Sequence, residues 1–263
     1  MTIPADFAAG PFMKLPKDAA AEAKLSALGY ESLDEKLAER FHTTVATLLA
    51  LNPTVAAAAS PTQTAPAALA SASSDTESTP TAPAHFQAGQ QIRVPNIGAD
   101  QIEPGSVNDS DWAATLASLG VGSAQPAAAR VVVSKSQGTL KAYDAGDKMI
   151  AEFTATMGSS HDPLPLGPWK ITGIAHNPKF HYNPELFWDV SDKKSPEMLP
   201  PGPNSPVGVV WINISKPHYG IHGTPHPETI GRAESHGCVR LTNWDAARLA
   251  QMVSTSTKLL FEA

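Results

Sequence analysis

The chain's only cysteine lies near the end of its 263 residues, in the segment Ser235-His236-Gly237-Cys238. A second histidine beside a glycine, His222, lies upstream of this segment. A thiolate attacks carbonyl carbons, and an imidazole next to it can accept the thiol proton and later return it to a leaving amine. These residue types at this spacing therefore predict an enzyme that uses a cysteine nucleophile.

The two histidines have different expected roles. His222 is the candidate general base, and we expect its other ring nitrogen to bond a backbone carbonyl such as that of Gly223, which fixes the tautomer. His236 is a second candidate, expected mainly to shape the turn or to lower the pKa of the thiol. Gly237 permits a sharp bend, so the backbone amides of Gly237 and Cys238 can point at a developing oxyanion.

Four further residues are candidates for substrate binding. Arg240 lies two residues beyond Cys238 and, in an extended segment, points to the same side. Its guanidinium suits a substrate carboxylate and an internal ion pair equally well. Tyr219 offers its hydroxyl to the oxyanion or packs beside the site, and Ser235 is expected to hydrogen-bond the turn rather than to react. Gly223, next to the candidate base, completes the set.

The spacing of three histidines also permits metal chemistry. His218, His222 and His226 recur at intervals of four, and together with Cys238 or His236 they suggest zinc. Four-residue spacing gathers ligands only on a helix, and the intervening residues that oppose a helix are Gly220, Gly223 and Pro225. No His-Glu-x-x-His segment supplies a base for a metal-bound water. We therefore expect no metal and no cofactor, with a zinc hydrolase as the weaker alternative.

The composition limits the classes of partner. A net charge of −6 without a Lys/Arg-rich run argues against nucleic acid binding. Hydrophobic residues make up 42% of the chain, which is enough for at least one core. The first residues lack the pattern of a signal peptide, and no apolar run is long enough to cross a bilayer. One cysteine excludes an internal disulfide.

From residue 130 onward the pattern is that of short strands. Alternating segments at 131–135, 139–143 and 149–156 predict a three-stranded meander. Further elements are expected as strands at 169–174, 208–214 and 259–261 and as a helix over 243–253. Residues 130–263 are therefore predicted to form a mostly β domain with a short C-terminal helix.

Two segments are expected to lie outside any domain core. Residues 1–29 carry a short Ala-rich helical pattern over 19–28 and no core of their own, as a remnant of a truncated domain would. Residues 97–129 are expected to be a linker with one short helix over 112–119. That helix would be capped by one of the residues Asp109, Ser110 and Asp111.

Two helices, an insertion and a strand are predicted between these segments. Ser32 caps the first helix, and Thr43 or Thr44 caps the second. Residues 54–84 consist mainly of Ala, Ser, Thr and Pro and cannot bury enough apolar surface to offset their ordering entropy, which predicts a disordered insertion. An alternating strand follows at 89–95.

Residues 30–96 resemble a LysM module, a small α+β unit with βααβ order that binds glycan. The positions that carry this resemblance are Leu33, Leu37, Ala38, Phe41, Leu48, Leu51, Asn52, Pro53, Gly89, Ile92, Val94 and Pro95. The first strand is poorly marked, and the insertion at 54–84 separates the second helix from the last strand. Glycan binding is what the resemblance implies, and a helical spacer without a ligand is the alternative.

Residues 130–263 resemble the catalytic domain of L,D-transpeptidases of the YkuD type. The segments that carry this resemblance are His222-Gly223 and Ser235-His236-Gly237-Cys238-Val239-Arg240, with the loops at Gly158, Pro163, 167–171 and 201–208. The resemblance implies a β-sandwich or barrel for this domain, peptidoglycan stem peptides as partners and inhibition by carbapenem-type compounds. It also implies a periplasmic or cell-envelope location, although this sequence shows no export signal.

The resemblance also implies the reaction. Cys238 attacks the carbonyl at the L-centre of the third residue of a tetrapeptide stem, and His222 protonates the departing D-Ala. An amine of a second stem resolves the thioester into a 3→3 cross-link, whereas water as acceptor would make the enzyme an L,D-carboxypeptidase. A further alternative is a cell-wall-binding protein whose catalytic domain is inactive.

Overall fold

The structure is a computed structural model that describes residues 1–53, 84–184, 195–233, 235 and 237–263. The predicted disordered insertion lies outside the described residues except for Ala84, and so does His236. The expectations for the insertion and for His236 therefore stay predictions. No helix in the described part of the chain is long and apolar enough to cross a membrane.

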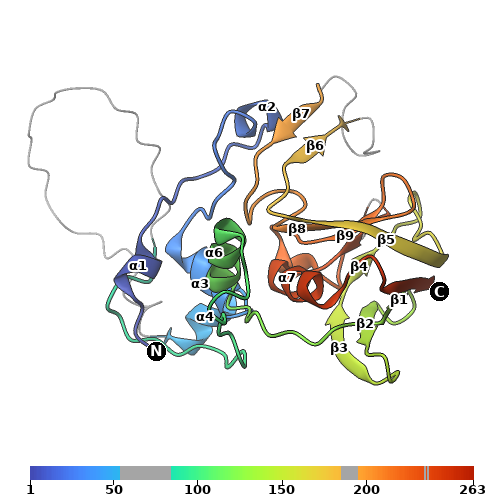
Figure 1. Cartoon of the computed structure of the whole chain (residues 1–263). Coiled ribbons are helices and arrows are strands. Elements are labelled where there is room, and N and C mark those ends of the chain that lie inside the picture. Colours follow the sequence, from blue (N-terminus) through green and yellow to red (C-terminus); the bar gives the residue numbers. More distant parts are fainter. Residues whose placement is uncertain (54–83, 185–194, 234, 236) are drawn as a thin grey trace, which may run out of the picture.

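Within the described residues, nine strands from the second half of the chain form one sheet (Figure 1). The strands are β1 (Arg130–Ser134), β2 (Thr139–Tyr143), β3 (Met149–Thr154), β4 (Thr156–Met157), β5 (Gly167–His176), β8 (Val210–Ile214), β9 (Gly220–His222), β10 (Val239–Arg240) and β11 (Lys258–Glu262). Their order across the sheet is β3-β2-β1-β11-β5-β8-β9-β10-β4. The predicted mostly β fold class is confirmed.

Helices accompany this sheet on one flank and in its middle (Figure 1). They are α1 (Ala5–Ala8), α2 (Ala19–Glu22), α3 (Leu33–Arg40), α4 (Val45–Leu51), α6 (Ser110–Leu119) and α7 (Asn243–Met252). The predicted helix over 243–253 is α7, and Thr242 caps it by accepting a hydrogen bond from the backbone of Asp245. The helix predicted over 19–28 is shorter than expected, because only Ala19–Glu22 is helical.

The long strand β5 joins two halves of the sheet. Its first residues pair with β11 and its later residues pair with β8, with an irregular register between Ile171 and Gly173. Such an irregularity bends a strand and increases its twist. The single sheet therefore curves toward a barrel, in agreement with the expected sandwich or barrel.

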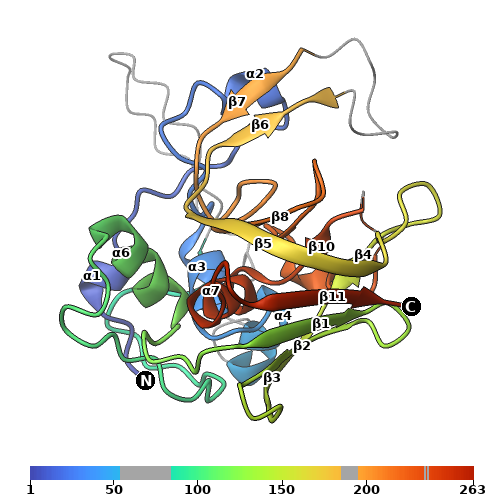
Figure 2. The ribbon, with the colours of Figure 1, turned by 45° about the vertical axis from the view of Figure 1, so that its right-hand side comes forward.

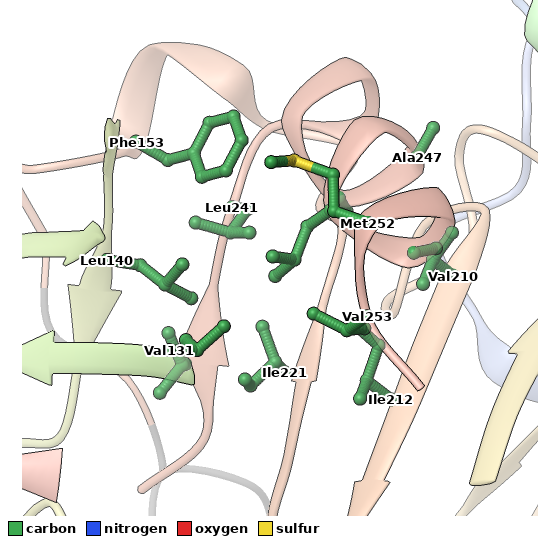
Figure 3. Packing of buried hydrophobic residues seen from close by; sticks show 14 of the residues in the cluster. Val131, Leu140, Phe153, Val210, Ile212, Ile221, Leu241, Ala247, Met252 and Val253 are labelled. Carbon is green, nitrogen blue, oxygen red and sulfur yellow. The ribbon is translucent and has the colours of Figure 1, made fainter. Parts of the chain in front are cut away.

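The two halves of the sheet share one hydrophobic core with α7 (Figure 3). Val131 and Leu140 come from the first half, Ile212 and Ile221 from the second, and Met252 from the helix. All five are almost fully buried. The core therefore fixes the second half, where the candidate residues lie, against the rest of the domain.

The structure confirms the longer predicted strands and adds short ones. The predicted meander is β1, β2 and β3, and the predicted C-terminal strand is β11, which lies inside the sheet between β1 and β5. The sequence does not predict β9, β10 or the separate hairpin of β6 (Phe180–Tyr182) and β7 (Glu197–Leu199), which Figure 2 shows beside α2. Strands of two or three residues are too short to show a period of two.

The expectation that residues 97–129 are only a linker is wrong. Asp109, one of the three residues predicted as a possible cap, caps α6. Leu116 and Leu119 of this helix are fully buried in the same core as the sheet. Trp112 stacks on His176 of β5 with ring centroids 4.1 Å apart and an interplanar angle of 1°. The apolar face of α6 thus makes it part of the core beneath the sheet.

The predicted helix pair in the first half is confirmed. Ser32 caps α3 by accepting from the backbone of Glu35, and Thr44 caps α4 by accepting from Thr47. The prediction of a strand at 89–95 is wrong. Within this segment only Gln91 forms a β-bridge, to Thr2, and the bridge is isolated. A single bridge does not extend into the ladder that the alternating pattern suggested.

The expectation that residues 1–29 lack any core is also wrong. The backbone of Ile3 donates to Gln90 at 2.9 Å, and that of Ile92 donates to Met1 at 2.8 Å. Ile3 is 1% exposed and lies in a second hydrophobic cluster with Leu37 of α3. The first residues of the chain therefore complete the backbone pairing that residues 90–92 need. The LysM resemblance itself stays a prediction.

Candidate active site

The pairing of β9 with β10 decides which way the candidate side chains face. The two strands are parallel, with Ile221 opposite Val239 and His222 opposite Arg240. Ile221 and Val239 are buried in the core. Because side chains alternate along a strand, His222 and Arg240 lie on the other face, and so does Cys238, two residues before Arg240. The sheet thus brings two distant segments of the sequence to one surface.

The hydrogen bond expected for His222 is present. Its Nδ1 lies 2.6 Å from the carbonyl oxygen of Gly223. A carbonyl only accepts, so in neutral His222 the proton is on Nδ1, and Nε2 is the basic nitrogen. The ring is buried and stacks on Trp211 with centroids 5.2 Å apart. The imidazole is therefore fixed in both tautomer and orientation.

His222 is neutral at physiological pH. Burial lowers its pKa to about 3, and the positive charge of Arg240 lowers it further, against the opposite effect of the bond to Gly223. A neutral imidazole can accept a proton, whereas an imidazolium cannot. The ring is therefore in the protonation state that a general base requires.

The thiol of Cys238 is not acidified in the resting structure. Burial of the half-buried side chain raises the thiol pKa above its ordinary value, and Asp162 raises it as well. A hydrogen bond from the backbone of Gly220 and the charge of Arg240 lower the pKa, but burial is the largest effect. The expectation that His236 lowers the thiol pKa stays a prediction, because His236 lies outside the described residues.

The chain bends at Gly237 before Cys238, as expected, while the oxyanion contact of the Gly237 and Cys238 amides stays a prediction. Gly237 has a φ of 92°, a left-handed conformation that side chains rarely adopt. The hydroxyl of Ser235 donates to the carbonyl of Cys238 at 2.6 Å and accepts from the backbone of Gly158 at 2.6 Å. Ser235 therefore holds the turn, as expected, and connects it to the neighbouring loop.

Tyr219 lies against this turn. A Cβ atom added to Gly237 would come within 2.5 Å of the Tyr219 ring. Burial raises the pKa of the Tyr219 hydroxyl, as do the negative charges that Asp162 and Cys238 carry when ionised. Lys216 lies over the ring, with its Nζ 4.7 Å from the centroid. Tyr219 is thus close to the thiol, and the choice between oxyanion contact and packing stays a prediction.

Arg240 and Gly223 both lie beside His222. The charge of Arg240 acts on both His222 and Cys238, which places it beside the candidate base and nucleophile. Gly223 supplies the carbonyl that receives the His222 proton. Carboxylate binding by Arg240 and substrate contact by Gly223 stay predictions.

The three spaced histidines do not share a helical face. His222 belongs to β9, and His226 lies in a turn with its Nδ1 3.6 Å from Glu228. His218 has a φ of 65°. Among the residues that the structure describes, no three His, Cys, Asp or Glu side chains are grouped so that they could hold a metal ion.

Sequence reasoning missed several residues that surround the site. Trp211 lies opposite His222 in the register of β8 and β9 and stacks on its ring. Asp162 lies in the loop after β4, and its negative charge raises the pKa of the Cys238 thiol. Neither is adjacent to the motif in sequence, so only the register of strands and the path of a loop reveal them.

A comparison with known families identifies the domain that carries this site. A family model of the L,D-transpeptidase catalytic domain, YkuD, matches residues 128–260, half of the chain. The chain belongs to this YkuD family. The match contains all the candidate residues and confirms the resemblance of the second half, while residues 1–127 lie outside it.

Relatives share the second half of the chain. YkuD of Bacillus licheniformis is 30% identical over 130 residues, which cover 49% of this chain and 63% of that protein. YkuD of Bacillus subtilis is 47% identical over 57 residues, or 22% of this chain and 35% of that protein. A solved L,D-transpeptidase from Mycobacterium smegmatis is 20% identical over 51% of this chain and 58% of that chain, with a TM-score of 0.42. The chain thus matches less than two thirds of each of these proteins.

The raised pKa of Cys238 predicts how its reactivity depends on pH. Because the thiolate is the reactive form, alkylation by iodoacetamide should accelerate continuously between about pH 6 and pH 10, without a plateau near neutrality. Intact-mass measurements of the rate report on this residue alone, since Cys238 is the only cysteine. Cys238→Ser is the control and should show no adduct. A rate already maximal at neutral pH would contradict the neutral resting thiol.

Proposed function

We propose that the protein is a peptidoglycan L,D-transpeptidase with Cys238 as its nucleophile and His222 as its general base. The observation that carries this proposal is the common face of β9 and β10, on which a neutral imidazole with a fixed tautomer lies opposite Arg240, which is two residues along the chain from the thiol. Membership of the YkuD family supports the same reaction class.

The donor half-reaction transfers an acyl group to sulfur. As the sulfur of Cys238 bonds to the carbonyl carbon of the third stem residue, Nε2 of His222 takes the thiol proton. The backbone amides of Gly237 and Cys238 stabilise the resulting oxyanion. Collapse breaks the carbon–nitrogen bond, and D-Ala leaves as an amine that takes the proton from His222. A thioester on Cys238 remains.

The acceptor half-reaction reverses these proton transfers. A side-chain amine of a second stem attacks the thioester and gives a proton to His222, and the sulfur leaves and regains a proton. The product is a 3→3 cross-link. If water attacks instead, the product is a tripeptide stem and the enzyme is an L,D-carboxypeptidase. Exclusion of water at the acceptor position decides between these outcomes.

The protonation states of Cys238 and His222 in the resting site favour a mechanism in which substrate binding activates this pair. Thiol and imidazole are both neutral, so no thiolate–imidazolium pair exists before the donor binds. The positive charge of Arg240 lowers the basicity of His222 in the resting structure. A stem carboxylate bound by Arg240 would offset that charge and raise the pKa of His222. Substrate binding by Arg240 would then strengthen the base.

The substrate also determines the location and the other partners. Peptidoglycan stems lie outside the cytoplasmic membrane, so we place the reaction in the periplasm or cell envelope. The LysM-like part would bind the glycan of the same polymer. Carbapenem-type compounds would acylate Cys238, because their strained carbonyl is attacked in the same way as that of the donor stem.

Incubation with purified tetrapeptide stems tests the proposed reaction. Mass spectrometry should detect free D-Ala, cross-linked dimers and an acyl adduct on Cys238, and Cys238→Ala should abolish all three. His222→Gln should lower the rate of D-Ala release by roughly 10²- to 10⁴-fold, the usual contribution of a general base. Tripeptide without dimers would favour the carboxypeptidase. Persistence of D-Ala release in Cys238→Ala would contradict the assignment.

The turn at Gly237 gives a second prediction with a matched control. Gly237→Ala forces a left-handed residue to carry a Cβ that collides with Tyr219, so D-Ala release should fall by at least about tenfold. Gly89→Ala introduces the same kind of backbone strain at a φ of 77°, with nothing within 4 Å of the new Cβ. That control should retain the wild-type rate. Equal rates in the two variants would show that the turn does not position the nucleophile.

A further inference from the structure

The first half of the chain contacts the catalytic domain through buried polar groups. α3, α6 and α7 pack against one another (Figure 1). Where the end of α3 meets the start of α7, Nδ2 of Asn243 donates to Oε1 of Glu39 at 2.9 Å. The hydroxyl of Tyr30 lies 3.0 Å from Oε2 of the same carboxyl group. Glu39 is 5% exposed and Asn243 is 0% exposed, so this bond is fully shielded from water.

The side chain of Asn243 is held at both ends. Its Nδ2 also donates to the carbonyl of Pro203 at 2.9 Å. Its Oδ1 accepts from the backbone of Val209 at 3.3 Å. Both amide hydrogens of Asn243 are therefore used, one of them by Glu39. Loss of the Glu39 carboxyl would leave one of them buried without an acceptor, which is costly enough to shift the side chain.

Asn243 in turn lies against the backbone beside His222. A Cβ atom added to Gly223 would collide with Oδ1 of Asn243, and so would one added to Gly208. The amide of Asn243 thus contacts the peptide whose carbonyl receives the Nδ1 proton of His222. A chain of direct contacts leads from α3 to the imidazole.

We infer that Glu39 is a positioning residue for His222: by holding Asn243 against Gly223, it fixes the carbonyl that orients the base. The inference rests on the proposed role of His222. It makes the first half of the chain a structural part of the active site in addition to any role in glycan binding.

Glu39 acts through a neutral hydrogen bond. Burial raises its pKa to about 8, hydrogen bonds from Asn243 and Tyr30 lower it, and the charge of Glu35 raises it. Ser118 of α6 also faces this group, through the Tyr30 hydroxyl. At neutral pH the acid is mostly protonated, so Gln can replace it with nearly the same shape and hydrogen-bonding capacity.

If Glu39 only helped to hold α3 against the catalytic domain, loss of another contact between these two parts would slow the reaction equally. Glu35, one turn earlier on α3, also contacts the catalytic domain, because its Oε1 accepts from Asn204 at 2.7 Å. Neither Glu35 nor Asn204 is hydrogen-bonded to Asn243. Glu35→Leu therefore removes a comparable contact between the same two parts of the chain and leaves the Glu39–Asn243–Gly223 contacts in place.

The test measures acylation of Cys238 by imipenem in the full chain, followed by intact mass over a range of imipenem concentrations. Glu39→Leu should lower the limiting acylation rate constant roughly ten- to hundredfold without changing the half-saturating concentration, because the base is misplaced while the binding surface persists. Glu39→Gln and Glu35→Leu should both acylate near the wild-type rate. Circular dichroism confirms that each variant is folded.

Three results would overturn the inference: a wild-type rate in Glu39→Leu, failure of Glu39→Gln to restore the rate, or an equal loss in Glu35→Leu. If Glu39→Leu does not fold, Glu39→Asp replaces it. Asp keeps the acid but is one methylene shorter, so it must also slow acylation, and a wild-type rate in Glu39→Asp would refute the inference. Absence of acylation in the wild-type protein would instead refute the proposed function.

Discussion

The hydrogen bond from Nδ1 of His222 to the carbonyl of Gly223 is the interaction on which the site depends. It joins the ring to the backbone of the next residue at 2.6 Å, so no acidic side chain is needed to select the tautomer. Burial keeps the imidazole neutral by lowering its pKa to about 3. The same burial also raises the pKa of the Cys238 thiol. The resting site therefore holds two neutral groups, and proton transfer must accompany the attack on the substrate.

The hydrophobic core positions this pair. Ile221 and Val239 lie opposite each other in β9 and β10 and are buried beneath the sheet. Alternation along these strands leaves His222 and Cys238 on the other face. Burial of two aliphatic side chains thus sets the relative position of two polar ones that lie 16 residues apart in the sequence. On the same face, Trp211 stacks on the imidazole from the neighbouring strand.

Local sequence predicted the parts of the site that depend on local geometry. The bond from His222 to Gly223 and the role of Ser235 in the turn involve residues within a few positions of each other, and both are confirmed. The effect of burial on the thiol pKa could not be predicted from local sequence, because burial depends on the whole fold and outweighs the described groups that favour the thiolate. Asn243 and Glu39 were not predicted as parts of the site, since 204 residues separate them.

The same distinction holds for the fold. The meander and α7 have clear periods of two and of 3.6, and they form as predicted. The pairing of residues 1–3 with residues 90–92 has no such signal, because three residues cannot show a period. Because residues 89–92 pair with only these three residues, the alternating pattern at 89–95 forms one bridge and no strand.

The protonation state of His222 is the most direct test of this account. In protein labelled with ¹⁵N-histidine, the ring signals of His222, assigned with the His222→Gln variant, should show a protonated Nδ1 and an unprotonated Nε2. They should not titrate between about pH 8 and pH 5, because the folded-state pKa lies well below the usual histidine value. A ring that carries its proton on Nε2, or that becomes an imidazolium near pH 6.5, the ordinary histidine pKa, would contradict the account.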